Sequence, residues 1–291
     1  MGGATALDDV LRQAHVVRIG LVGGDGTDAR VQVDLSDAVE SARLRKAMAV
    51  EALPGFHCMC SGDVRFELTD RSGQRIAVVV LHHGETLRWE RWESDAVLAD
   101  GRSLLAWLDG HGMTAPLRQF EDDRRRADER AAQERDWMAA MPAGLGDTAD
   151  RILDLSRTGG RPSPALLAEL TERLRRSCPD PVERVLALLS WYGSGSGRCS
   201  GFPVHEGVPG ELLRHVPITG LVAALLDPRA RGRHDAGAVR HLVGRRSRPH
   251  QERDLAGLPE PLRARLPAHA RGSSDPDKRG RAERWLVPGR G

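Results

Sequence analysis

Cysteine and histidine side chains, which bind transition metals and act as nucleophiles, flank one predicted β-hairpin. The stretch His57–Cys60 (His-Cys-Met-Cys) enters this hairpin, and Leu81–Gly84 (Leu-His-His-Gly) leaves it. Two thiols and an imidazole at one place could be the first ligands of a Zn²⁺ ion, or a pair in which histidine lowers the pKa of a cysteine. The chemistry therefore depends on whether the two strands bring these residues together.

The turn of the hairpin decides which residues meet. Turn-forming residues surround Gly73, and closing the strands there places His83 opposite Gly62 and one diagonal step from Cys60. Cys58, Cys60 and His83 then share the same strand parity and so the same face. We expect the three side chains to converge at one end of a sheet.

This pattern predicts a zinc site with Cys58, Cys60, His83 and His57 as ligands. His82, a more distant residue or a water molecule are alternatives for the fourth position. The spacing differs from the usual C-x₂₋₄-C, because an extended C-x-C segment holds its two Cα atoms about 6.6 Å apart with parallel side chains. The same geometry favours two thiols over a disulfide unless a bulge bends the chain.

Two other interpretations of the same residues stay open. The cysteines could be small core hydrophobes, with His83 bound to a backbone carbonyl, since free cysteine is among the most often buried residue types. A histidine could instead activate one cysteine as a reactive thiol. An open site with a shared focal point would favour the metal, and a sealed core would exclude an enzyme that uses these groups.

The elements that must position these residues define an α+β domain over residues 1–115. Apolar and polar residues alternate on both sides of a glycine-rich turn within 17–35, which predicts a hairpin. A helix capped by Asp37 is predicted to run to Leu53, before Pro-Gly stops it. The hairpin that carries the cysteines is predicted over Phe56–Trp92. We expect an antiparallel sheet of four or five strands with short helices.

Three further segments follow this domain. Residues 116–147 carry dense mixed charge with little apolar stripe, which predicts a solvated helical connector. Residues 148–271 are predicted to form an all-α domain, in which Ser163 and Asp180 each cap a helix that starts with proline. Its helical pairs could form a HEAT-like stack, by analogy only, since no fixed-period repeat is present. Residues 272–291 are predicted to be a basic, partly flexible tail.

A glycine-rich stretch at Gly193–Gly201 is a second candidate site. It lacks the lysine of a phosphate-binding loop, and no strand precedes it as the nucleophile elbow of a hydrolase would need. Cys199 lies within it, and His205 and Glu206 are close enough in sequence to orient a thiol, as is His215. We predict a flexible loop here, with catalysis as the weaker alternative.

Charge is unevenly distributed along the chain. The 43 Lys/Arg and 41 Asp/Glu residues give a net charge of +2, but residues 228–291 hold 16 basic and 7 acidic residues, a charge of +9 that leaves −7 on residues 1–227. The basic segment could bind the phosphates of a nucleic acid, or the acidic body of its own chain or of a partner. The arginines that suggest this are Arg229, Arg231, Arg233, Arg240, Arg245, Arg246 and Arg248.

Several features of the sequence indicate the cellular compartment of the protein. The longest aliphatic run, Ile76–Leu81, has six residues, far fewer than the roughly 20 that a membrane helix needs. Asp8 and Asp9 lie where a signal peptide would be apolar, so we expect a cytoplasmic protein. Four cysteines are too few for a disulfide framework. Lys46 and Lys278 are the only lysines, an arginine bias typical of a GC-rich bacterial genome.

Taken together, the sequence predicts a cytoplasmic two-domain protein that binds other macromolecules as a scaffold or adaptor. A protein is the favoured partner, nucleic acid at residues 228–291 is the alternative, and a membrane is not expected. No pair of carboxylates, complete phosphate loop or catalytic triad indicates a reaction. The alternative function is that of an enzyme or metal-binding protein that uses Cys58, Cys60 and His83 with Zn²⁺ or as a reactive thiol.

Overall fold

The computed structural model describes residues 2–23, 31–244 and 248–286. The chain forms two compact units, residues 1–127 and 128–291. The first holds an antiparallel sheet with short helices and the second is all-α, which confirms the predicted α+β fold class. The boundary between the units falls inside the helix α4 (Thr114–Ala139).

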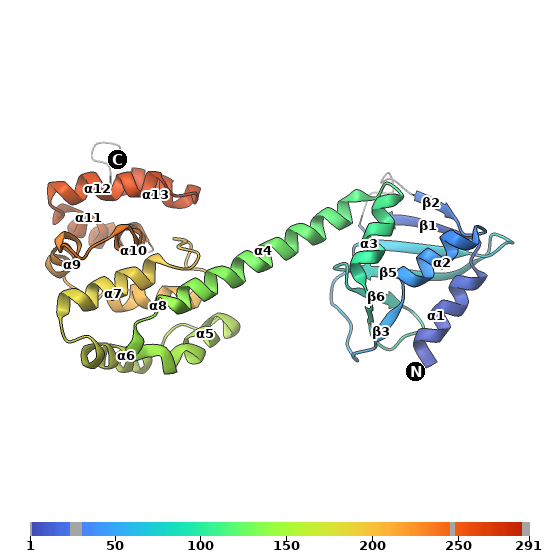
Figure 1. The fold of residues 1–291 in the computed structure, drawn as a ribbon, viewed down its shortest axis with the longest axis horizontal. Helices are drawn as coiled ribbons and strands as arrows, with labels where there is room; N and C mark the ends of the chain where they lie inside the picture. Colours follow the sequence, from blue (N-terminus) through green and yellow to red (C-terminus); the bar gives the residue numbers. More distant parts are fainter. Residues whose placement is uncertain (1, 24–30, 245–247, 287–291) are drawn as a thin grey trace. The chain divides into compact units, whose positions relative to one another are not determined.

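The sheet unit contains seven strands in the order β2-β1-β4-β5-β6-β7-β3 (Figure 1). Its strands are β1 (Val16–Leu21), β2 (Val31–Asp34), β3 (Val50–Ala52), β4 (Val64–Thr69), β5 (Arg75–His82), β6 (Thr86–Trp89) and β7 (Ala96–Leu98). Every neighbouring pair is antiparallel. The expected four or five strands are thus too few, because β3 and β7 have three residues each and leave almost no alternating pattern to detect.

The central hairpin has the predicted register. Val64 pairs with Leu81, Phe66 with Val79 and Leu68 with Ala77. These side chains are buried on one face of the sheet, beneath the helices α1 (Gly2–Gln13), α2 (Ala38–Ala47) and α3 (Gly101–Gly110) (Figure 1). Residues of opposite parity on β5 and β6 therefore point to the other face, which these helices do not cover.

The helix predicted to end at Leu53 is shorter than expected. Asp37 caps α2 by accepting a hydrogen bond from the amide of Val39, as predicted, but α2 ends at Ala47. Residues Val50–Ala52 then form β3, which pairs with β7 at the edge of the sheet. Strand pairing with a segment almost 50 residues away outweighs the local helical signal. Because of this pairing, the segment that follows β3 starts at the edge of the sheet.

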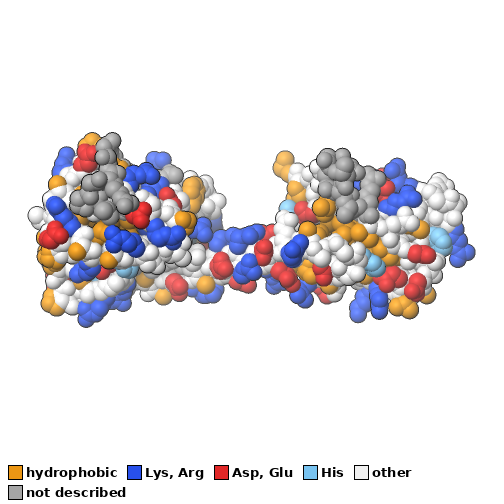
Figure 2. Space-filling view, turned by 90° about the horizontal axis from the view of Figure 1, so that it is seen from above, with side chains coloured by type: hydrophobic (Ala, Val, Ile, Leu, Met, Phe, Trp, Pro, Cys, Tyr) orange, Lys and Arg blue, Asp and Glu red, His pale blue; other side chains and the backbone are white. Residues whose placement is uncertain are grey.

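The charged segment predicted as a connector is helical, as α4, and then forms the 3₁₀ turn η1 (Ala143–Thr148). Charged side chains of both signs alternate along α4 (Figure 2), and pairs such as Arg125–Asp122 and Arg126–Asp123 lie one turn apart. Within α4, only Trp137 is buried among the residues that the structure describes, so the helix is solvated, as its sequence indicates.

The helical unit surrounds a core that includes Trp137, Trp191 and many leucines. In it, α7 packs most extensively on α10, and α12 on α13. Its elements after η1 are α5 (Ala149–Thr158), α6 (Pro164–Ser177), α7 (Pro181–Gly193), the 3₁₀ turn η2 (Val204–Gly207), α8 (Val208–Leu213), α9 (Ile218–Leu226), α10 (Gly232–Val243), α11 (Arg248–Ala256), α12 (Glu260–Arg271) and α13 (Pro276–Leu286).

Local cap signals predicted the starts of two of these helices. The side chain of Ser163 accepts a hydrogen bond from the amide of Leu166, and that of Asp180 accepts one from Val182. In the tail segment 272–291, residues 276–286 form α13, which packs on α10 and α12, and residues 287–291 lie outside the described part. Among the helices that the structure describes, none combines the length and apolar character needed to cross a membrane.

Candidate metal centre

The cysteine-bearing segment crosses the open face of the sheet. It connects β3, at the edge beside β7, to β4, in the middle beside β5, so it must pass over β7, β6 and β5. Residues 53–63 do this without forming a strand, which corrects the prediction that the hairpin starts near Phe56. The C-x-C segment is therefore not extended, and its side chains are free to converge.

A glycine lets this segment lie close to β5. Gly62 has a φ of +89°, a left-handed conformation that favours glycine. A Cβ atom at this position would overlap Cγ1 of Val80 and lie 3.1 Å from Nε2 of His82. The close approach of the segment to the open face of β5 thus requires glycine here.

An ion pair on the sheet, formed by Arg88 and Asp95, holds the backbone of the segment. We call this pair the clamp. Arg88, on β6, donates to the carbonyl oxygens of Cys58 and Cys60, while Asp95, just before β7, accepts a hydrogen bond of 2.7 Å from the amide of Cys58. The guanidinium of Arg88 also binds both carboxylate oxygens of Asp95 at 2.8 Å. Because Asp95 is only 2 % exposed, this pair forms a fixed support for the two cysteines.

The clamp brings two thiols and two imidazoles together. The Sγ atoms of Cys58 and Cys60 lie 3.0 Å apart. Nδ1 of His82 lies 3.0 Å from Sγ of Cys60, and Nε2 of His83 lies 3.3 Å from Cys60 and 3.4 Å from Cys58. In the part of the chain that the structure describes, Cys58, Cys60 and His82 form a group whose donor atoms all lie within 4.8 Å of one another. We call Cys58, Cys60, His82 and His83 the thiol–imidazole cluster.

Electrostatics divide the two thiols into one that ionises and one that does not. Hydrogen bonds from Cys60 and its amide, and then from His83, lower the pKa of Cys58 from its ordinary 9.0 to about 7. The neighbouring Cys58 and burial raise the pKa of Cys60. Arg88 adds a positive charge beside both sulfur atoms. Near neutral pH Cys58 is therefore partly ionised while Cys60 stays protonated, and a metal cation would stabilise the negative charge.

The two histidines also differ. Burial, followed by the charge of Arg88, lowers the pKa of His82, so this fully buried ring is neutral and able to bind a metal. The hydrogen bond with Cys58 raises the pKa of His83, whose amide is held by the carboxylate of Asp63. Among the described atoms Nε2 of His82 has no hydrogen-bond partner.

The donor set and its spacing fit Zn²⁺. Two sulfur and two nitrogen donors are a usual set for a tetrahedral zinc site, with Zn–S of about 2.3 Å and Zn–N of about 2.0–2.1 Å, which places neighbouring donors about 3.4–3.8 Å apart. The four separations given for pairs that include a sulfur atom, 3.0–3.4 Å, are slightly shorter. Cys58 and Cys60 are half-buried in a segment without secondary structure, and with His82 they form the group whose donor atoms could surround an ion.

The structure brings together three of the four residues that the sequence proposed as ligands. Cys58, Cys60 and His83 meet, but Nδ1 of His57 lies 2.8 Å from Asp95 and supports the clamp instead. His82 stands beside the thiols where His57 was expected. Because the cysteines are half-buried and face imidazoles, the interpretation that they are core hydrophobes is wrong.

His83 lies near the thiols for a reason other than the strand parity that predicted it. Cys58 and Cys60 are not in a strand, and β5 ends at His82. His83 has a φ of +54°, which turns the chain so that both histidines can face the thiols. Arg88 and Asp95 gave no signal in the sequence, since their role depends on a segment that crosses the sheet from its edge.

The second candidate site is a closed structural network. Glu206 accepts hydrogen bonds from the amide and hydroxyl of Ser196 and lies 2.9 Å from the guanidinium of Arg240; Glu206 and Arg240 are each 1 % exposed. Burial raises the pKa of Cys199, so its thiol stays protonated. His205 contacts Ser156 instead of this thiol. The predicted loop is thus anchored, and its residues are not arranged for nucleophilic catalysis.

Several arginines of the basic segment have acidic partners within the helical unit. Arg229 binds Asp227 and Asp180, Arg240 binds Glu206, and Arg265 binds Asp235. Arg245 and Arg246 lie outside the described residues, as does the side chain of Arg248. Acidic residues of the same chain therefore balance part of the segment's positive charge. Binding of nucleic acid by this segment stays a prediction.

Comparisons with known proteins add no assignment: no family model, no curated protein and no solved structure matches this chain. Among the described residues, the thiol–imidazole cluster and its clamp form a group of side chains that could bind a metal ion. The residue types and spacing of Cys58, Cys60 and His82 could hold a metal ion.

Proposed function

We propose that the sheet unit is a zinc-binding domain in which Cys58, Cys60, His82 and His83 hold one Zn²⁺ ion. The observation that carries this proposal is that Cys60 lies within 3.0–3.3 Å of Cys58, His82 and His83, on a segment fixed at both cysteines by Arg88. The bound ion would tie the crossing segment 53–63 to the end of β5. A reducing compartment such as a bacterial cytoplasm would keep both thiols available.

The test is metal analysis of the full-length protein purified with a reductant. We expect about one zinc per chain, loss of that zinc in Cys58→Ser and His82→Ala, and a lower melting temperature after chelation. Cys199→Ser is the matched control, since its thiol is buried in the helical unit, and it should keep the metal. Wild-type protein with reduced thiols that neither carries zinc nor binds added zinc with a melting shift would overturn the proposal.

Cobalt substitution gives an independent reading of the ligands. Thiolate-bound Co²⁺ has a charge-transfer absorption in the near ultraviolet, and we expect this band to weaken in Cys58→Ser and again in the double variant with Cys60→Ser. His57→Ala should keep the band, because the side chain of His57 is bound to Asp95. A band that disappears in His57→Ala but persists in His82→Ala would contradict this ligand set.

An apolar groove on the helical unit favours a second candidate function, the binding of a partner protein. The groove has a volume of about 1060 Å³ between α6, α7 and the region of α8 and α9. Leu167, Val182, Val185 and Val216 line it, and Arg175 at its rim has no ion-pair partner among the described residues. We propose that it receives the apolar face of a partner helix with an acidic flank, since an apolar groove with a basic rim complements such a helix.

This second proposal is tested by locating the contact. Cross-linking of captured partners should join the groove to one amphipathic acidic segment, and the synthetic segment should bind wild-type protein but bind Ala168→Arg at least tenfold more weakly. Ala165→Arg is the matched control, because Ala165 is also exposed on α6 but lies outside the groove. No captured partner, cross-links elsewhere, or equal binding to both variants would refute it.

A further inference from the structure

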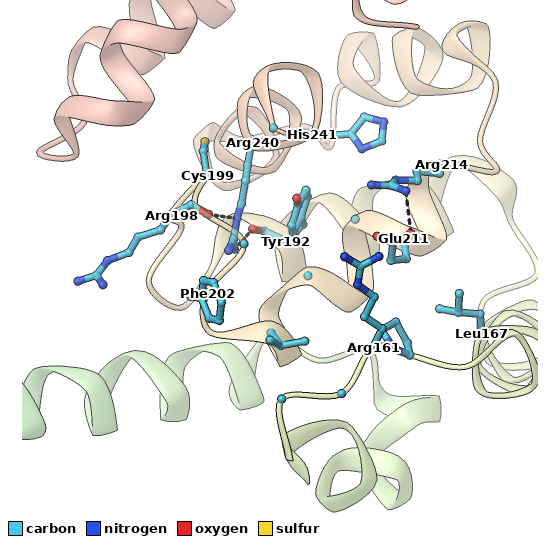
Figure 3. A pocket seen from close by; sticks show the side chains of 18 residues that line it. Arg161, Leu167, Tyr192, Arg198, Cys199, Phe202, Glu211, Arg214, Arg240 and His241 are labelled. Carbon is cyan, nitrogen blue, oxygen red and sulfur yellow. Dashed lines mark hydrogen bonds and ion pairs between the residues drawn. The ribbon is translucent and has the colours of Figure 1, made fainter. Parts of the chain in front are cut away.

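The helical unit contains a second cavity, distinct from the apolar groove in its chemistry. Its volume is about 630 Å³, within the range of small-molecule sites. Its walls come from the linker between α5 and α6, from α7, from the loop 194–203 and from α8 and α10 (Figure 3). Six of its eighteen lining residues are glycine, so backbone groups are accessible along much of its wall.

The lining of this cavity is positively charged. Four arginines line it, and Glu211 is the one acidic residue among them. Glu211 is paired with Arg214 at 3.1 Å, and the charge of Arg240 is balanced by the buried Glu206 behind it. The remaining two arginines differ: the side chain of Arg198 points away from the cavity, whereas that of Arg161 points into it (Figure 3).

Among the described residues, Arg161 is an arginine that points into the cavity and has no internal partner. It lies on the exposed linker between α5 and α6, and within the described residues its guanidinium makes no hydrogen bond or ion pair. Arginines elsewhere on the surface of this unit, such as Arg151, Arg157 and Arg176, lie against carboxylates. A guanidinium directed into a cavity with its five donors unused is suited to a carboxylate or phosphate group, which it binds through two parallel hydrogen bonds.

Aromatic rings supply the other half of the recognition surface. Tyr192 lies in the cavity wall with the guanidinium of Arg240 4.7 Å from its ring centroid, and Phe202, which is 63 % exposed, lines the same space. The tyrosine lies against Gly210, where a Cβ would come within 2.6 Å of its ring carbon Cζ. Two rings near one free guanidinium are complementary to a planar apolar body that carries an anionic group.

We propose that this cavity binds a small aromatic acid, with its carboxylate or phosphate group on Arg161 and its ring against Tyr192 and Phe202. The proposal is independent of the zinc centre, since no residue of the sheet unit contributes to the cavity.

The experiment is a titration of the full-length protein with phenyl phosphate by calorimetry at low ionic strength, with benzoate and benzyl alcohol as comparison probes. We expect saturable binding of one phenyl phosphate or benzoate per chain, and much weaker binding of the uncharged alcohol. Arg161→Gln should weaken binding about tenfold, the effect of losing one charge-assisted bidentate contact. Phe202→Ala should weaken it several-fold.

Arg157→Gln is the matched control, because Arg157 is an exposed arginine at the end of α5 that does not line the cavity. It should bind the probes as the wild type does. Both arginines are exposed, so both variants should fold, and circular dichroism would verify this. Absence of saturable binding at millimolar phenyl phosphate, or equal affinity in wild type and Arg161→Gln, would overturn the proposal.

Discussion

Two polar clusters in this molecule each contain an arginine–carboxylate ion pair, and they differ in what the remaining polar atoms face. In the helical unit, the buried carboxylate of Glu206 and guanidinium of Arg240 bind each other, the loop 194–203 and backbone carbonyls. In the sheet unit, Arg88 and Asp95 bind each other, the backbone of the cysteine segment and the side chain of His57, and the thiols and the imidazoles of His82 and His83 face one another. The polar atoms of the first cluster bind one another, whereas the second cluster gathers thiol and imidazole donors that could bind a metal ion.

The largest effect that this contrast predicts is the loss of the completed cluster. Arg240→Met would leave the carboxylate of Glu206 buried without its cationic partner, so we expect the free energy of unfolding of the helical unit to fall by about 3–5 kcal/mol. Urea unfolding followed by tryptophan fluorescence would measure this, because Trp137 and Trp191 lie in the core of that unit.

The control for this prediction is an arginine of the same basic segment that is exposed. Arg229 pairs with Asp227 and Asp180 but is 51 % exposed, so Arg229→Gln should cost at most about 1 kcal/mol. Metal content should not change in either variant, because the residues of the centre belong to the sheet unit. Equal losses in the two variants would mean that burial does not distinguish the two ion pairs.

The supporting ion pair of the sheet unit should affect metal affinity more than stability. Burial disfavours the charged form of Asp95, but hydrogen bonds from Arg88, His57 and the amide of Cys58 outweigh it and hold the pKa well below its ordinary value. Asp95→Asn removes that charge, so Arg88 loses its partner and the cysteine segment loosens. We expect a 10- to 100-fold weaker zinc affinity, measured by competition with a chromophoric chelator.

A carboxylate at the opposite end of the same hairpin provides the comparison. Asp70 accepts hydrogen bonds from Ser72 and Gln74 in the turn and is remote in register from the cysteines. Asp70→Asn should bind zinc as the wild type does. A similar loss of affinity in both variants would show that the hairpin as a whole, and not the clamp, positions the ligands.

The sequence predicted the parts of this site that depend on local pattern. Alternating apolar residues and a turn near Gly73 define the register of β4 and β5, which the structure confirms. His82, and not His57, lies beside the thiols. Strand β5 ends at His82, and the backbone of His83 then turns with a positive φ. Alternation with a period of two predicts which face each residue of a strand lies on, but it does not predict the backbone conformation of the residue that follows the strand.

The support of the site depends on contacts that no local pattern encodes. Arg88 meets the carbonyls of Cys58 and Cys60 only because β3 pairs with β7 at the edge, which forces the connection to β4 across the sheet. In the helical unit, the caps at Ser163 and Asp180 were local signals and were predicted correctly. The pairing of Arg240 with Glu206 joins residues more than 30 positions apart, and no local pattern predicted it.

The smallest effect separates the two kinds of cysteine by their reactivity. In metal-free protein, iodoacetamide alkylates the thiolate, so the rate at Cys58 should be half-maximal near pH 7, rise up to about pH 8 and then level off, in keeping with its pKa of about 7. Burial raises the pKa of Cys199, and its thiol should stay unmodified in the folded protein over the same range.

The same lowered pKa has a consequence for stability whose sign can be checked. Ionisation of Cys58 stabilises the metal-free fold fully above its unfolded pKa of about 9, and that stabilisation is lost as the pH falls through the folded value of about 7. Zinc should suppress both effects, because the bound thiolate neither titrates near pH 7 nor reacts readily. Mass spectrometry of the alkylated peptides measures the rates, and alkylation of Cys199 at the rate of Cys58 would contradict the division between an open and a closed cluster.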